Sequence, residues 1–150
     1  MSLQDQLLEN MKQAMRDKDE VKLGTIRMLR AKIKNQEIDL GPLDDEQVQK
    51  LAQQTIKQWQ DAIQDYKKGD RHDLVEEAEQ KIEILQEYLP QQLSDEELAE
   101  IINQIKEETG LDQVGPIIGK VKQKVGNQAE GSRIAKLVNQ IFSWLNFESL

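Results

Sequence analysis

Apolar residues recur every three or four positions along almost the whole chain, as they do on one face of an α-helix. The longest such run begins near residue 48 and lasts for roughly five helical turns. No segment shows the strict alternation of apolar and polar residues that marks a half-buried strand. The pattern therefore predicts an all-α protein. The stripe of the longest run is Val48, Leu51, Ala52, Thr55, Ile56, Trp59, Ala62, Ile63 and Tyr66.

Four helices are predicted in the first part of the chain. Ser2 is a suitable N-cap for the first helix, and the second spans about residues 19–36. The pair Gly41-Pro42 then breaks the chain, and Asp44 is a suitable N-cap for the third helix.

A stop-and-restart signal separates the third helix from the fourth. Gly69 is expected at the first position past the third helix, and Asp70 is expected to cap the fourth. The fourth helix ends at Pro90, and its apolar stripe is Leu74, Val75, Ala78, Ile82, Leu85 and Leu89.

Three shorter helices are predicted in the rest of the chain. Ser94 and Glu97 form a capping box at the start of the fifth helix. The sixth begins near Pro116, a residue suited to the first helical position, and the seventh follows a glycine-containing turn. We therefore expect a helical N-terminal domain of about four helices over residues 1–92 and a three-helix C-terminal domain over residues 93–150.

The composition narrows the choice of protein class. Of 150 residues, 37% are hydrophobic and 32% are charged, which fits a small helical protein with a large polar surface. The chain has no cysteine, and this excludes disulfides, thiolate catalysis and cysteine-ligated metal. No run approaches the ~18 apolar residues of a membrane span, and the first residues do not resemble a secretory signal. These features predict a cytoplasmic protein without a membrane segment.

The charges are distributed unevenly. The net charge is −8, and residues 41–110 hold 7 basic and 18 acidic residues. In contrast, residues 21–36 hold five basic residues and residues 113–129 hold three, and neither segment contains an acidic residue. Two local basic surfaces could therefore bind a polyanion although the whole protein is acidic. The alternative interpretation is that these are ordinary solvated helix faces.

The sequence lacks the residues of the familiar catalytic and metal sites. His72 is the sole histidine and lies in a charged turn, where a histidine is usually inert. No glycine-rich phosphate loop of the GxxxxGK[ST] type is present. The carboxylates Glu76, Glu79, Glu83 and Glu87 share one helix face, which indicates a solvated acidic surface rather than a metal site. We therefore predict no catalytic residue, no cofactor and no metal.

Binding is the remaining class of function. Basic ridges on helices can contact phosphates, with an affinity that depends on salt. The candidate contacts are Arg27, Arg30 and Lys34 on the second helix, Lys120 and Lys124 on the sixth, and Arg133 at the start of the seventh.

Three parts of the chain resemble the GatB/YqeY family, in the layout of the free-standing YqeY type. They are residues 26–38 (IRMLRAKIKNQEI), residues 67–98 (KKGDRHDLVEEAEQKIEILQEYLPQQLSDEEL), and a pattern of glycines with an Ala-Glu-Gly turn. The order and spacing of these parts are more specific than any one of them, and together they cover about residues 2–142. Glycines at such turns either let a partner approach the backbone closely or only allow tight turns between helices. The pattern consists of Gly115, Gly119, Ala129, Glu130 and Gly131.

The resemblance implies an all-helical, bacterial-type protein with a small three-helix C-terminal domain. The same module forms the tail of GatB, a subunit of the glutamine-dependent aminoacyl-tRNA amidotransferase, and there it contacts the body of the tRNA. The catalytic motifs of that enzyme lie in other parts of it and are not found in this sequence. The resemblance therefore implies contact with tRNA but no catalytic activity. A description of such a chain as a carbon–nitrogen ligase would be inherited from the parent enzyme.

The chain departs from the family pattern at several positions. Residues 126–128 read Gly-Asn-Gln where the family tends to have Lys-Gly-Arg, and residues 57–60 read Lys-Gln-Trp-Gln where the family often has a basic pair. Each lost phosphate contact weakens RNA binding and flattens its dependence on salt. The ending FSWLNFESL lies outside the pattern, and its apolar residues either complete the core or form a surface for a partner. These residues are Phe142, Trp144, Leu145 and Phe147.

The leading hypothesis is a tRNA-binding accessory protein associated with a tRNA-handling enzyme. One alternative is a protein-interaction adaptor that docks through its acidic middle helices and aromatic C-terminus. Another is a chain that assists an amidotransferase without being an enzyme itself.

Overall fold

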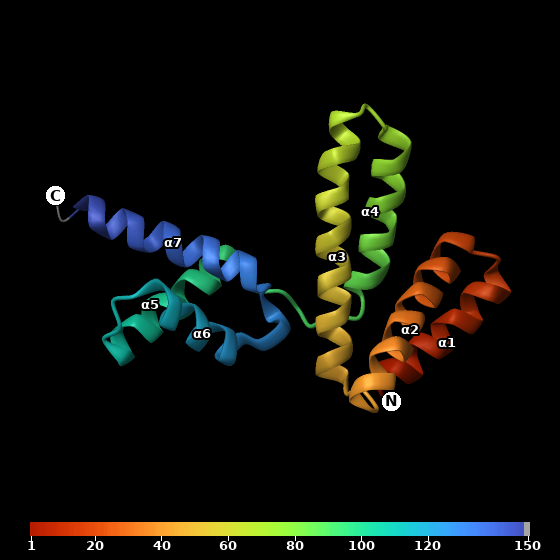
Figure 1. Ribbon diagram of the computed structural model, residues 1–150, viewed down its shortest axis with the longest axis horizontal. Coiled ribbons are helices and arrows are strands. Elements are labelled where there is room, and N and C mark those ends of the chain that lie inside the picture. The colour runs from red at the N-terminus through yellow and green to blue at the C-terminus, as the bar shows by residue number, and fades with distance from the viewer. Residues whose placement is uncertain (149–150) are drawn as a thin grey trace. The chain divides into compact units, whose positions relative to one another are not determined.

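All regular elements in the part of the chain that is described are helical. The structure is a computed structural model, which describes the backbone of residues 1–148 and the side chains of residues 1–143. This confirms the all-α prediction. The elements are α1 (Leu3–Asp17), α2 (Glu20–Leu40), α3 (Asp45–Lys68), α4 (His72–Gln86), α5 (Asp95–Thr109), α6 (Val114–Val125), the 3₁₀ turn η1 (Gly126–Gln128) and α7 (Gly131–Glu148) (Figure 1).

The chain divides after Pro90 into two compact units, each with its own hydrophobic core. The first unit consists of two antiparallel helical hairpins, α1 with α2 and α3 with α4 (Figure 1). The second unit contains α5, α6 and α7. Side chains from every helix of the first unit reach its core, among them Leu7, Ile26, Val48 and Leu85. Those at the centre of the second core are Leu98, Ile102, Ile117, Val121, Ile134 and Val138.

The predicted N-caps of three helices are confirmed. The hydroxyl of Ser2, the carboxylate of Asp44 and the hydroxyl of Ser94 each accept a hydrogen bond from the third residue of the helix that follows, and each is part of a capping box. These caps satisfy backbone N–H groups that have no partner inside the helix. The second helix starts at the predicted place and continues to Leu40, beyond the predicted end at residue 36. It stops at Gly41, whose φ of 74° lies in a region that favours glycine.

The connection between α3 and α4 differs from the prediction. Gly69 has φ −91°, and the left-handed residue is Asp70, with φ 56°. The N–H of Asp70 donates to the carbonyl of Lys67, and the N–H of Arg71 donates to the carbonyl of Tyr66, which is a Schellman motif. Asp70 therefore terminates α3 and is not the cap of α4. Arg71 occupies the N-cap position without a side-chain cap.

The sixth helix begins earlier than expected. Its first residue is Val114, so Pro116 is the third helical residue and not the first. Proline is tolerated here because the first four N–H groups of a helix have no intrahelical acceptor.

Candidate nucleic-acid interface

The three basic residues of α2 share one face of the helix but differ in their surroundings. Their spacing places Arg27, Arg30 and Lys34 within about 60° of one another around the helix axis. Arg27 and Lys34 are exposed, and neither forms a hydrogen bond or ion pair with a described residue. Arg30 is half-buried, and its Nη1 lies 3.1 Å from the sulfur of Met11 on α1. The ridge therefore offers two free cations and one that is partly packed.

An acidic group lies beside this ridge. A cavity of about 190 Å³ between α1 and α2 is lined by Arg30, Lys34 and Glu37, among others. The Glu37 carboxylate accepts hydrogen bonds from the backbone N–H of Leu43 (3.0 Å) and from the side chain of Gln4 (3.2 Å). The bond from Leu43, then that from Gln4, and also the charge of Lys34 lower the pKa of Glu37. The ionised Glu37 carboxylate repels phosphate. A phosphate group should therefore bind more favourably at Arg27 than at Lys34, which lies near Glu37.

The three lysines of α6 fall into two groups. Lys120 and Lys124 are exposed one turn apart, and neither forms a hydrogen bond or ion pair with a described residue. Lys122 points toward the turn that follows the helix. Its ammonium donates to the carbonyls of Gly126 (2.9 Å) and Ala129 (3.0 Å). Lys122 is therefore a structural residue, whereas Lys120 and Lys124 are available to a ligand.

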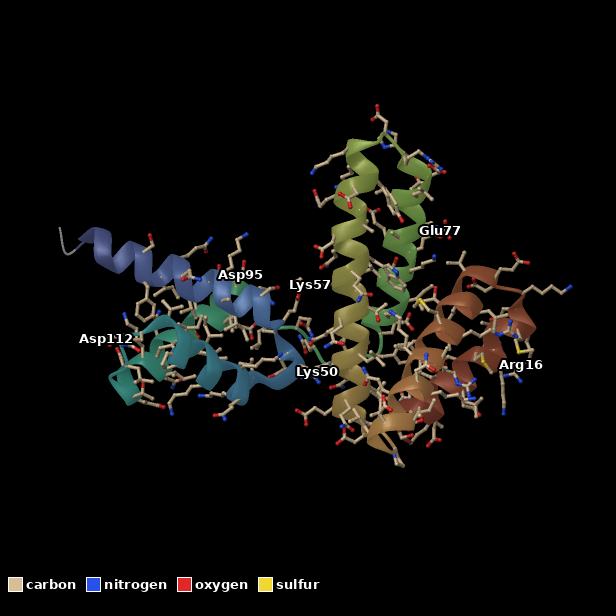
Figure 2. All side chains as sticks on the ribbon, viewed as in Figure 1. Arg16, Lys50, Lys57, Glu77, Asp95 and Asp112 are labelled. Carbon is tan, nitrogen blue, oxygen red and sulfur yellow. The ribbon has the colours of Figure 1, made fainter. Side chains whose placement is uncertain are left out.

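Arg133 is engaged within the second unit. Its Nε and Nη2 lie 3.0 and 2.9 Å from Oδ1 of Asp95, which is labelled in Figure 2 at the start of α5. Nη2 also donates to the carbonyl of Leu93. The guanidinium thus joins the first turn of α7 to the segment before α5, and the Asp95 carboxylate balances its charge.

The five residues of the glycine pattern do not form one surface. Gly115 and Gly119 lie on the exposed face of α6, and a Cβ added to either would have no atom within 4 Å. Ala129 is completely buried, and Glu130 accepts a hydrogen bond from the hydroxyl of Ser132. Gly131 is the first residue of α7. The pattern therefore combines an open helix face with a packed turn.

The segment Gly-Asn-Gln at residues 126–128 has a structural role. Asn127 is buried in the 3₁₀ turn, and its carbonyl accepts a hydrogen bond from the side chain of Gln92 (2.9 Å). The N–H of Leu93 donates to the carbonyl of Gln128 (2.9 Å). The turn thereby holds the segment that leads into α5.

The remaining polar candidates are on the surface. His72 is exposed at the start of α4, with Nε2 3.7 Å from a carboxylate oxygen of Asp70. Glu76, Glu79 and Glu83 are exposed on α4, and Glu87 is exposed at its C-cap. Across the described residues, no three histidine, cysteine or carboxylate side chains are grouped so that they could hold a metal ion. Within the same residues, no helix is both long and apolar enough to span a membrane.

The aromatic end of the chain is described only in part. Phe142 packs against the second core, and the ammonium of Lys106 lies 4.8 Å from the centroid of its ring. The side chains of Trp144, Leu145 and Phe147 lie outside the described residues.

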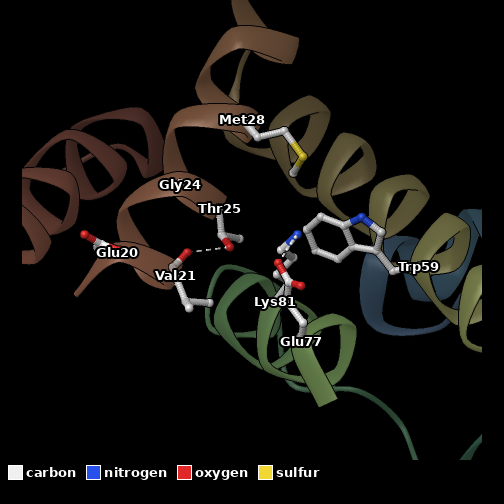
Figure 3. Close-up of a pocket in the computed structure, with 8 residues that line it drawn as sticks. All are labelled: Glu20, Val21, Gly24, Thr25, Met28, Trp59, Glu77 and Lys81. Carbon is white, nitrogen blue, oxygen red and sulfur yellow. Dashed lines mark hydrogen bonds and ion pairs between the residues drawn. The ribbon is translucent and has the colours of Figure 1, made fainter. Parts of the chain in front are cut away.

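A cavity in the first unit was missed by the sequence analysis. It has a volume of about 420 Å³ and lies where α2, α3 and α4 meet, with Trp59 and Lys81 in its lining (Figure 3). The helical spacing placed Trp59 in the buried stripe of α3, but the ring is only half-buried. The one available signal in the sequence was the large size of this side chain among mostly aliphatic residues of the stripe.

Comparison with known proteins identifies the family. The profile of the family described as YqeY-like protein matches residues 4–142. The chain belongs to the YqeY-like family. Curated relatives of this YqeY-like protein are fungal and carry the name altered inheritance of mitochondria protein 41, mitochondrial. That of Vanderwaltozyma polyspora is 35% identical over 113 residues, which cover 69% of this chain and 60% of the relative.

Two further relatives carry the same name. The Lachancea thermotolerans protein is 41% identical over 87 residues, 57% of this chain and 46% of the relative. The Clavispora lusitaniae protein is 31% identical over 120 residues, 76% of this chain and 71% of the relative. The match thus spans about half to three fifths of the length of the first two relatives.

These names correct the expected location. The prediction of a cytoplasmic protein is wrong, because the relatives are named as mitochondrial proteins. A sequence without cysteine, whose described helices include none that could span a membrane, fits the cytoplasm and the inside of a mitochondrion equally well. The expectation of a bacterial-type protein likewise has no support among these fungal relatives.

Proposed function

We propose that this YqeY-like protein is a non-catalytic accessory protein that binds tRNA and works beside an aminoacyl-tRNA amidotransferase. The observation that carries the proposal is a pair of exposed lysines on α6, Lys120 and Lys124, neither of which is paired with a described residue. They lie one turn apart, in a stretch of the chain without acidic residues. Both ammonium groups could contact a phosphate backbone that lies along this side of the helix.

The ridge on α2 provides a second set of contacts. Arg27 and Lys34 are exposed, neither is paired with a described residue, and Arg30 lies on the same face of the helix. We leave Arg133 out of the contact set because Asp95 already balances its charge. Each unit thus offers two cations for phosphate contacts, so the affinity should be modest and should fall as salt is added.

The first experiment is a titration of tRNA, including mitochondrial tRNA, with the purified protein at low and at physiological salt. We expect binding at low salt that weakens as the salt concentration rises. The double variant Lys120→Glu/Lys124→Glu should abolish binding, and Arg27→Glu/Lys34→Glu should weaken it and reduce the salt slope by about 0.7–0.9 for each lost contact.

A matched control separates a defined surface from a general effect of charge. The variant Lys136→Glu/Lys12→Glu changes the net charge by the same amount at two exposed positions outside both sets. It should retain most of the affinity. If the Lys120/Lys124 variant binds tRNA as well as the unchanged protein does, the proposed surface on α6 is wrong.

An adaptor role is favoured by one observation, the exposed row of carboxylates on α4. Deletion of residues 143–150 should abolish the capture of a protein partner by an adaptor but leave tRNA binding unchanged. Association with an amidotransferase has its own test. Addition of the protein should raise the transamidation rate of the core enzyme, and an unchanged rate would contradict that part of the proposal.

A further inference from the structure

The cavity of about 420 Å³ in the first unit has no part in the proposed tRNA contacts. It lies within the 300–1,000 Å³ range that is usual for small-molecule sites. One wall comes from α2, the other from α4, and an indole from α3 closes one side (Figure 3). The lining consists of Glu20, Val21, Gly24, Thr25, Met28, Trp59, Glu77 and Lys81.

An alkylammonium group already lies in this cavity. The Nζ atom of Lys81 is 3.3 Å from a carboxylate oxygen of Glu77 and 6.0 Å from the centroid of the Trp59 ring. In Figure 3 the side chains of Lys81 and Glu77 point toward the six-membered ring of the indole. A carboxylate and an aromatic face together stabilise a cation more than either does alone. The walls are therefore arranged for an ammonium, and the chain's own lysine holds that position.

The charge of the lining is negative. Glu20 adds a second carboxylate to the lining, and it forms no ion pair with a described residue, although its oxygens point away from Lys81 (Figure 3). The lining therefore holds two acidic groups and one lysine. An anionic ligand would be repelled by this surplus, whereas a cationic ligand would be attracted.

Glycine at position 24 is required neither by the backbone nor by packing. Gly24 lies inside α2, has no positive φ, and a Cβ added there would meet nothing within 4 Å. A glycine inside a helix costs about 1 kcal/mol relative to alanine. Its effect at this position is to expose helix backbone on the cavity wall, between Val21 and Met28. An aliphatic stem could lie against that wall.

We propose that this cavity binds a ligand with an alkylammonium group on an aliphatic stem, either a small polyamine or a lysine side chain. The ammonium takes the place between Glu77 and the Trp59 ring, and the stem lies along Gly24. The ligand competes with Lys81 for this place. This activity is independent of tRNA binding.

The test uses cadaverine as the probe, without RNA and at constant ionic strength. The chain has two tryptophans, so Trp144→Phe leaves Trp59 as the sole tryptophan, which is excited at a wavelength where tyrosine does not absorb. We expect a saturable change in Trp59 fluorescence with cadaverine and none with 1,5-pentanediol, which has the same stem and no charge. The absence of a saturable change with cadaverine would overturn the proposal.

Two substitutions identify the cavity as the site. Lys81→Met removes the competing cation and should tighten cadaverine binding by roughly three- to tenfold. Gly24→Leu fills the space beside the stem and should weaken binding at least tenfold, with the helical content retained. Unchanged affinity in both variants would place the probe elsewhere and overturn the proposal.

A matched pair of charge variants tests specificity. Glu77→Gln should weaken cadaverine binding, whereas Glu76→Gln, an exposed neighbour on α4 outside the lining, should not. Equal losses would indicate non-specific attraction to an acidic protein and would contradict the proposal. Nα-acetyl-lysinamide distinguishes the two sources of the ligand. If it binds as tightly as cadaverine, a lysine side chain is sufficient; if cadaverine binds more tightly, the ligand is a polyamine.

Discussion

At the residue scale, identical side chains on one helix have different roles, and Lys122 is the clearest case. Its ammonium donates to the carbonyls of Gly126 and Ala129, whereas Lys124 faces solvent. We expect Lys122→Met to lower the free energy of unfolding of the second unit by about 1–3 kcal/mol, because two carbonyls lose their donor. Lys124→Met should change it by less than about 0.5 kcal/mol. Urea denaturation followed by circular dichroism measures both, and equal effects would show that the turn does not depend on Lys122.

Glu37 gives a prediction about pH. Hydrogen bonds from Leu43 and Gln4 hold its pKa below the ordinary value of 4.5 in the folded state. At pH values above the ordinary pKa, the ionised Glu37 makes its full contribution to the stability of the first unit. This contribution is lost as the pH falls through the lowered pKa of the folded state. We expect Glu37→Gln to reduce the decrease in melting temperature between about pH 5 and pH 3. Glu9→Gln, at an exposed carboxylate, should leave this decrease in melting temperature unchanged. If Glu37→Gln shows the same decrease as the unchanged protein, Glu37 does not have this role.

At the element scale, the start of α5 depends on one side chain. The Ser94 hydroxyl accepts a hydrogen bond from the N–H of Glu97 (3.1 Å), and the Glu97 carboxylate accepts one from the N–H of Ser94 (3.2 Å). Ser94→Ala should destabilise the second unit by about 1 kcal/mol. Ser143→Ala, at an exposed position of α7, serves as the control. Thermal unfolding of both variants tests the prediction, which fails if the two melt at the same temperature.

The helices that could be predicted are those whose signals are local. A cap such as Ser94 acts on a residue three positions away, and an apolar stripe requires only helical spacing, so both can be recognised in the sequence. The left-handed Asp70 could not be predicted, because glycine next to it was the better candidate for that conformation. For the candidate interface, spacing identified which cations share a helix face. It could not reveal that Arg133 bonds Asp95, 38 positions earlier, because only the folded unit brings them together.

At the scale of the whole molecule, the boundary after Pro90 separates two units, each with its own hydrophobic core. Residues 92 and 93 are already bonded to the turn at residues 126–128, so a cut between residues 90 and 91 removes none of these hydrogen bonds. We expect fragments 1–90 and 91–150 each to be helical and to unfold cooperatively. The second fragment has 60 residues and should be the less stable, since small domains bury a smaller fraction of their surface.

Circular dichroism of the two fragments and of the full chain measures this independence. If each core is sufficient for its own unit to fold, the melting curve of the full chain should equal the sum of the two fragment curves. Arg133→Ala should then lower the transition of the second fragment alone, because the groups that the guanidinium bonds, Leu93 and Asp95, belong to the second unit. A fragment 91–150 that is unfolded by itself would show that its core needs the first unit. In that case the tRNA contacts on α6 would have to be measured in the full chain alone.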